Sequence, residues 1–196
     1  MTVSLSTSQR SPDSRNKDHR ALERAGLRPV ALRSPLQLVA PEGQLQIHTA
    51  PYRGSFSTVF SQAMRAAGLG SRVLIAQFLK GGVSQGPKDC VRLCGGLVWL
   101  RPDVQACLTE PDQANAHEAV DEIWQLCRQH LLSGNLDQLV LDEIGLAVGL
   151  GYLREDDLVS TLQQRPGSMD VIITGPAIPP SVMEMADQVT ELRRGF

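Results

Sequence analysis

Residues 45–58 read LQIHTAPYRGSFST, and the rest of the chain is interpreted around this stretch. Leu45–Thr49 is typical of a strand, a short loop with Pro51 and Gly54 follows, and a helix is expected from Ser57. A helix that begins directly after a strand and a tight loop offers free backbone N–H groups and a partial positive charge to a phosphate. The stretch therefore predicts the framework of a phosphate-binding loop.

The side chains that such a loop normally uses are missing. The usual pattern is G-x4-G-K-[ST], in which the Lys contacts the β- and γ-phosphates and the hydroxyl contacts magnesium. Gly54 is present, but Ser55 stands in the place of the Lys and Phe56 in the place of the hydroxyl. In addition, Pro51 has no N–H to donate to a phosphate. The sequence predicts the frame of a nucleotide site without its usual chemistry.

From residue 43 onward, segments typical of strands alternate with segments typical of helices. The expected strands are 45–49, 72–78, 97–100, 138–142, 170–174 and 188–192. The expected helices are 57–67, 115–132, 155–164 and 180–186, with Trp124 on the apolar face of the second. The run 171–173, Val-Ile-Ile, is continuously apolar, as in a parallel strand covered by helices on both faces. We therefore predict an α/β protein with three layers, α/β/α, a mostly parallel sheet and a P-loop NTPase-like architecture over residues 43–196.

Composition narrows the classes of protein. The 196 residues, 42% hydrophobic and 20% charged, suit one globular domain of ordinary composition. The net charge of −2 gives no reason to expect nucleic-acid or membrane binding, and no apolar run is long enough to span a bilayer. We expect a cytoplasmic protein.

Residues 1–42 differ in composition from the rest, since they are rich in Ser, Arg and Pro. We expect a basic N-terminal arm, largely disordered, with a short helix over residues 18–25. The arm either contacts a phosphate or an acidic protein partner, or it is a solvated tail.

The cysteines do not form a zinc-binding pattern. The spacings of Cys90, Cys94, Cys107 and Cys127 do not match a pair of C-x2-C motifs. We interpret them as reduced, mostly buried thiols. A metal site with His117 and His130 is the alternative.

Charged candidates for a site follow two of the expected strands. The strand 138–142 is apolar up to Asp142, and Glu143 comes next. Ligands bind at the carboxyl ends of parallel strands, so both acids are expected near Gly54, with Asp142 as a magnesium ligand and both as catalytic candidates. The alternative is a solvated acidic turn. Lys80, in a Gly-rich loop, is either a cation of the same site or an exposed lysine.

Taken in order, these segments resemble the P-loop ATP:corrinoid adenosyltransferase family, which transfers adenosyl from ATP to cob(I)alamin or cob(I)yrinic acid a,c-diamide. The motifs that carry the resemblance are Arg65-Ala66-Ala67-Gly68, Gln77-Phe78-Leu79-Lys80-Gly81, Leu141-Asp142-Glu143-Ile144, Thr174-Gly175 with Pro179, and Ala186-Asp187-Gln188-Val189-Thr190-Glu191-Leu192. The last block is not a general feature of nucleotide-binding proteins. The resemblance covers residues 44–192.

The resemblance implies ATP, magnesium and a corrinoid as ligands, and relatives are commonly homodimers. It places in the nucleotide site Thr49, Arg53, Gly54, Ser55, Ser57 and Lys80. In the family reaction, reduced cobalt attacks the ribose 5′ carbon and triphosphate leaves. The protein then contributes positioning and neutralises the charge of the leaving group.

The sequence departs from the family where that neutralisation takes place. Ala50 and Tyr52 stand in the place of two family glycines, and Ser55 in the place of the Lys. Phe56 replaces the Thr, and Pro176 replaces an Arg. Because the loss of one such donor costs about 3–4 kcal/mol in the transition state, we expect impaired or lost ATP-dependent transfer and a binding or regulatory role. The alternative is an active adenosyltransferase of cobalamin biosynthesis in which Arg53 and Lys80 replace the missing Lys.

Overall fold

The computed structural model describes residues 42–54, 56–111 and 116–193. The helix expected over residues 18–25, nearly all of the expected arm, and Ser55 lie outside this part, so the expectations for them stay predictions. No helix in the described part is both long and apolar enough to cross a membrane.

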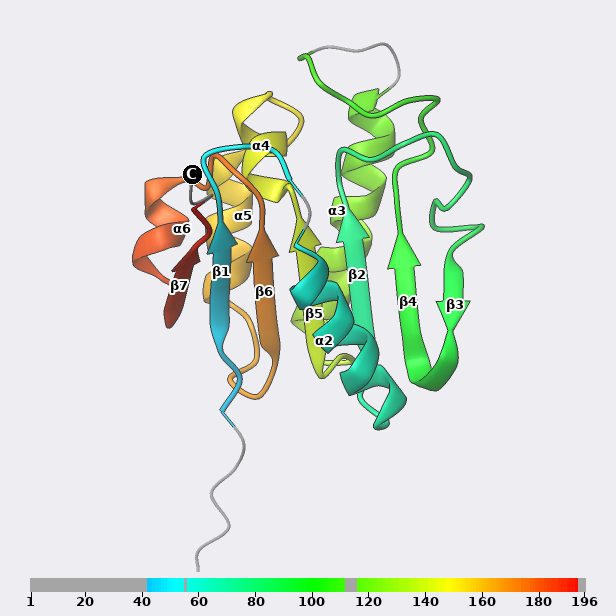
Figure 1. The fold of residues 1–196 in the computed structure, drawn as a ribbon, viewed down its shortest axis with the longest axis vertical. Helices are drawn as coiled ribbons and strands as arrows, with labels where there is room; N and C mark the ends of the chain where they lie inside the picture. Colours follow the sequence, from blue (N-terminus) through cyan, green and yellow to red (C-terminus); the bar gives the residue numbers. More distant parts are fainter. Residues whose placement is uncertain (1–41, 55, 112–115, 194–196) are drawn as a thin grey trace, which may run out of the picture. The chain divides into compact units, whose positions relative to one another are not determined.

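A seven-stranded sheet forms the middle layer, with the strand order β3-β4-β2-β5-β6-β1-β7 (Figure 1). The strands are β1 (Leu45–Thr49), β2 (Val73–Gln77), β3 (Val91–Leu93), β4 (Leu97–Leu100), β5 (Gln138–Asp142), β6 (Asp170–Thr174) and β7 (Gln188–Glu191). All neighbouring strands are parallel except β3 and β4. The mostly parallel sheet is confirmed.

Helices cover both faces of this sheet, which confirms the three-layer α/β/α architecture (Figure 1). The helices are α2 (Ser57–Gly68), α3 (Ala116–Ser133), α4 (Ile144–Gly149), α5 (Glu155–Gln163) and α6 (Pro180–Glu184). On one face, Ile75 of β2 and Val140 of β5 belong to one buried cluster with α2. On the other face, the alternate residues Leu74 and Leu141 belong to a larger cluster with α3, α4, α5 and α6. Successive side chains of a strand point to opposite faces of the sheet, and this alternation separates the two clusters.

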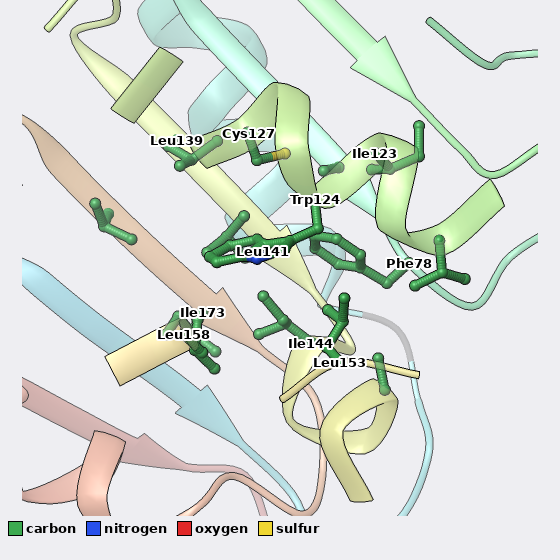
Figure 2. Packing of buried hydrophobic residues seen from close by; sticks show 14 of the residues in the cluster. Phe78, Ile123, Trp124, Cys127, Leu139, Leu141, Ile144, Leu153, Leu158 and Ile173 are labelled. Atoms are coloured by element: carbon green, nitrogen blue, oxygen red, sulfur yellow. The ribbon is translucent and has the colours of Figure 1, made fainter. Parts of the chain in front are cut away.

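The larger cluster is built around Trp124 of α3. Figure 2 shows Trp124 projecting from α3 toward Leu141 of β5, beside Phe78. The rings of Trp124 and Phe78 are 6.4 Å apart between centroids, and Trp124 is only 2% exposed. Full burial of a large apolar side chain contributes about 1.5–3 kcal/mol. The prediction that Trp124 belongs to the core is confirmed, and α3 is thereby fixed against the sheet.

The structure also contains elements that the sequence did not predict. The strand β3 is three residues long and partly exposed, so its alternation is too short to recognise. Cys94–Gly96 is a 3-10 helix, η1, between β3 and β4. The helix α4 reads IGLAVG, and two glycines in six residues obscure its helical character. The helix α6 ends at Glu184, two residues before the predicted end.

The cysteines are less buried than predicted. Cys127 is buried on α3, Cys90 is half-buried and Cys107 is exposed, and all three are free thiols. The interpretation that most thiols are buried was therefore too broad. Burial raises the pKa of the Cys127 thiol, which keeps it protonated.

Candidate functional site

The candidate site lies at the carboxyl ends of β2, β5 and β6. The last residues of these strands are Gln77, Asp142 and Thr174, and they are register partners across the sheet. All three side chains are buried. Gln77 Nε2 donates a hydrogen bond to Asp142 Oδ2 over 2.7 Å, and Thr174 Oγ1 donates to Asp142 Oδ1 over 2.7 Å. The strand register thus holds the Asp142 carboxylate between two neighbouring donors.

Lys80 supplies the charge that balances Asp142. Its Nζ lies 3.0 Å from Asp142 Oδ2 and 5.9 Å from the centroid of the Phe60 ring. The Lys80 side chain is 26% exposed, whereas that of Asp142 is 1% exposed. A carboxylate has about four acceptor positions, and three on Asp142 are filled by Gln77, Lys80 and Thr174. Lys80 is therefore part of the site and not an exposed loop lysine.

Gln77 is oriented by two further donors. Trp99 Nε1 donates to Gln77 Oε1 over 3.0 Å, and Arg101 Nε donates to the same oxygen over 2.8 Å. Both nitrogens are donors only, so the amide oxygen of Gln77 must face them and its NH2 group must face Asp142. Trp99 in turn packs against Phe60 of α2, with ring centroids 5.5 Å apart. The network connects the half-buried Trp99 and Arg101, at the end of β4, to the buried acid.

Arg53 forms the second ion pair of the site, with Glu143. Arg53 Nε lies 2.6 Å from Glu143 Oε1, and Arg53 Nη2 lies 2.8 Å from Glu143 Oε2. The guanidinium also donates to the carbonyl oxygens of Leu108 over 2.8 Å and of Leu79 over 3.2 Å. Glu143 is 1% exposed and Arg53 is 29% exposed. The hydrogen bonds to Glu143 raise the pKa of the Arg53 guanidinium, against the opposing effect of burial.

The backbone of Glu143 is in the left-handed region, with φ 62° and ψ 22°. Its N–H donates to the carbonyl of Thr174 over 2.7 Å, and a Cβ placed on Gly175 would lie 3.0 Å from its Cα. Ala177, in the loop after Thr174, also has a positive φ of 57°. Non-glycine residues adopt this region rarely, and such strain persists where surrounding structure enforces it, often at functional sites. The two loops are packed closely enough to enforce it.

The loop after β1 is packed by apolar side chains. Phe56 is 3% exposed and belongs to the cluster under α2, together with Ala50 and the partly buried Tyr52. Phe56 precedes the first residue of α2 and makes no side-chain capping hydrogen bond. A Cβ on Gly54 would lie 3.0 Å from the Tyr52 ring. Phe56 therefore packs into the core under α2 at the position where the usual phosphate loop presents a hydroxyl.

The structure brings together four of the predicted site residues: Arg53, Lys80, Asp142 and Glu143. Both acids are buried, so the interpretation of 142–143 as a solvated turn is wrong. Thr49 is half-buried at the end of β1 and Ser57 is exposed at the start of α2. Among the bonds within the described residues, neither side chain contacts the two acids. Ser55 lies outside the described residues.

Several members of the site were not predicted from the sequence. These are Gln77, Trp99, Arg101, Thr174 and the carbonyl groups of Leu79 and Leu108. A signal existed for Gln77 and Thr174, because each is a polar residue that directly follows the apolar run of a buried strand. Nothing in a sequence marks a carbonyl group as an acceptor.

Basic side chains and hydrogen-bond donors face the two buried acids of this edge. Within the described residues, no three of His, Cys, Asp and Glu converge where they could hold a metal ion. Arg53 is paired with Glu143, and Lys80 with Asp142. The site is an arrangement of two matched ion pairs, with Trp99 and Arg101 at its margin.

Comparison with known proteins shows what this chain is similar to. The family model described as ATP:corrinoid adenosyltransferase BtuR/CobO/CobP matches residues 41–195. The chain is 29% identical over 191 residues to a corrinoid adenosyltransferase of Pseudomonas aeruginosa. The aligned region covers 92% of this chain and 90% of the relative. It is 33% identical over 159 residues to the corrinoid adenosyltransferase of Escherichia coli K12. This aligned region covers 77% of this chain and 76% of the relative. The corrinoid adenosyltransferase CobA of Salmonella typhimurium is 30% identical over 163 residues.

Proposed function

The chain belongs to the ATP:corrinoid adenosyltransferase family, and we propose that it is a member that no longer carries out ordinary ATP-dependent adenosyl transfer and has a binding or regulatory role. One observation carries this proposal. Two cations of this edge, Arg53 and Lys80, are each paired with a buried acid, Glu143 and Asp142 respectively.

Magnesium does not fit the residues at this edge. Mg2+ requires nearly octahedral oxygen ligands at about 2.0–2.1 Å and usually binds through one or two carboxylates. The Asp142 oxygens already accept bonds from Gln77, Lys80 and Thr174, and the Glu143 oxygens accept from Arg53. A metal ion bound to either acid would lie close to the basic side chain that is paired with it, Lys80 or Arg53, and their like charges would oppose its binding. This supports the proposal that the degenerate phosphate loop has lost magnesium and ATP handling together.

An active enzyme that uses Arg53 and Lys80 in place of the missing Lys is the second candidate. The position of both cations at the carboxyl edge of the sheet favours it. However, a triphosphate that takes the guanidinium away from Glu143 leaves this acid buried without its partner. Breaking a buried ion pair costs about 3–5 kcal/mol, and the 29% exposure of Arg53 places the cost toward the lower end of this range. The ion pairs therefore oppose this candidate.

The ligand of first choice is a corrinoid, because the relatives are named for it. Residues 43–196 would form the binding domain, and the basic arm of residues 1–42 would offer a contact to an acidic protein partner. A second copy of the chain is a further partner to be expected from the resemblance.

Corrinoid binding and adenosyl transfer test the proposal in one set of assays. The purified protein is titrated with cob(II)alamin and followed by absorbance, and reduced corrinoid with Mg·ATP is then assayed for the cobalt–carbon product. We expect saturable corrinoid binding without product, with the Escherichia coli relative as the positive control. Product that disappears in Arg53→Ala and in Asp142→Ala would instead establish the active enzyme. Absence of both binding and product would contradict the corrinoid role.

A further inference from the structure

Four loops of the sheet meet at the guanidinium of Arg53. Arg53 itself follows β1, Leu79 follows β2, Leu108 lies in the segment after β4, and Glu143 follows β5. A guanidinium has five N–H donors. Four are used here: Nε and one N–H of Nη2 on Glu143, the other N–H of Nη2 on Leu79, and one of Nη1 on Leu108. One side chain therefore connects loops that are far apart in sequence.

The acceptors around Arg53 suit a planar cation. The two carboxylate oxygens of Glu143 receive parallel N–H groups, the fork geometry that arginine forms with carboxylates. The two carbonyl oxygens complete the arrangement as hydrogen-bond acceptors, 2.8 Å from Nη1 and 3.2 Å from Nη2. These acceptors are supplied by Leu79, Leu108 and Glu143, which are all buried.

The acceptor residues also hold one another. The N–H of Leu108 donates to the carbonyl of Leu79 over 2.9 Å, so the two carbonyl-bearing segments are hydrogen-bonded to each other. Glu143 is held by the hydrogen bond from its N–H to Thr174. Arg53 is 29% exposed, so its side chain enters this surrounding from the solvent side. A small cation has the same route when the side chain is shortened.

We infer that Arg53 is a built-in ligand: its guanidinium occupies a planar-cation site made by Glu143 and the carbonyls of Leu79 and Leu108, and holds together loops that a bound substrate would otherwise hold. The inference rests on the proposed function, since it takes this part of the site as filled by the chain itself. It follows that shortening Arg53 creates a binding site for a small guanidinium compound.

The test is rescue of Arg53→Ala by methylguanidinium. Because the variant leaves a buried carboxylate without its partner, we expect its unfolding equilibrium constant to rise about 100- to 1,000-fold in urea titrations. Methylguanidinium at millimolar concentration should reverse much of this rise. Methylammonium, which has the same charge without the planar fork, should reverse little of it at the same concentration.

Arg72→Ala is the matched control. Arg72 also forms a two-pronged pair, with Asp137 at 2.7 and 3.2 Å, but the two side chains are 56% and 46% exposed. Its loss should have a much smaller effect and no response to methylguanidinium. Equal effects of the two substitutions, or an equal response of Arg53→Ala to both cations, would overturn the inference.

Further variants keep the test decisive if Arg53→Ala does not fold. The double variant Arg53→Ala with Glu143→Gln removes both charges, so it should be more stable than Arg53→Ala and unresponsive to methylguanidinium. Arg53→Lys keeps the charge without the fork and should be intermediate in stability. If neither variant is more stable than Arg53→Ala, the inference is wrong.

Micromolar Mg·ATP binding by the unaltered protein would contradict the proposed function alone, whereas failed rescue without such binding would contradict the inference alone.

Discussion

Two fully buried threonines differ in their hydrogen bonding, and the difference separates the site from ordinary core. Thr174 Oγ1 donates to Asp142 over 2.7 Å, whereas Thr161 Oγ1 on α5 is buried without a hydrogen-bond partner among the described residues. Thr174→Val should lower the free energy of unfolding by about 1–3 kcal/mol, because it leaves the Asp142 carboxylate short of a donor. Thr161→Val should leave it unchanged or raise it, because the change removes an unsatisfied hydroxyl. Urea titrations of both variants give the comparison, and equal losses would show that Asp142 does not depend on Thr174.

At the same scale, the sequence predicted which charged residues gather but not how they pair. Asp142 and Glu143 follow an apolar strand, and Lys80 follows another, so their place at one edge of the sheet was predictable. The pairing of Arg53 with Glu143 was not, because it depends on the path of the loop after β1. That path is set by the packing of Phe56, Ala50 and Tyr52, which follows no periodic pattern.

The helix α4 connects the site to the loop after β6, and its glycines are not equivalent. A Cβ on Gly145 would lie 2.8 Å from both the carbonyl oxygen of Ala177 and the Cα of Ile178, whereas a Cβ on Gly149 meets nothing within 4 Å. Gly145→Ala should therefore destabilise the protein by about 1–3 kcal/mol and disturb Glu143, which directly precedes the helix. Gly149→Ala should be neutral or stabilise by up to about 0.5–1 kcal/mol.

Thermal unfolding measures the stability of both variants. Near-ultraviolet circular dichroism, to which Trp99 of the site contributes, reports on local disturbance. If Gly145→Ala is as stable as Gly149→Ala, the close approach of α4 to that loop does not position the site.

For the elements, strand prediction succeeded where burial on both faces makes the apolar run unmistakable. β5 and β6 begin and end as predicted because polar residues bound their apolar runs. α4 was missed because its six residues contain two glycines and its first turn follows a left-handed Glu143. Close packing against Ala177 stabilises a helix that propensity alone does not favour.

For the described domain, strand order explains why the site exists at this edge. β2, β5 and β6 are neighbours and parallel, so Gln77, Asp142 and Thr174 end side by side without any further constraint. Alternating strands and helices were enough to predict such an edge. The ion pairs that occupy it required the structure, because matched pairs depend on side-chain contacts between loops distant in sequence. The fold brings the polar ends of these strands together, and in this chain basic side chains pair with the acids there.

The central claim is that this chain no longer handles ATP as the family does. Calorimetric titration of the unaltered protein with Mg·ATP, with and without a corrinoid present, tests it most directly. Because Arg53 and Lys80 are paired with buried acids and the buried Phe56 replaces the hydroxyl of the usual phosphate loop, we predict no binding heat at millimolar Mg·ATP in either condition. The Escherichia coli relative, measured in the same buffers, serves as the positive control. Binding in the micromolar range would contradict the claim and would mean that the loop after β1 holds phosphates in another way.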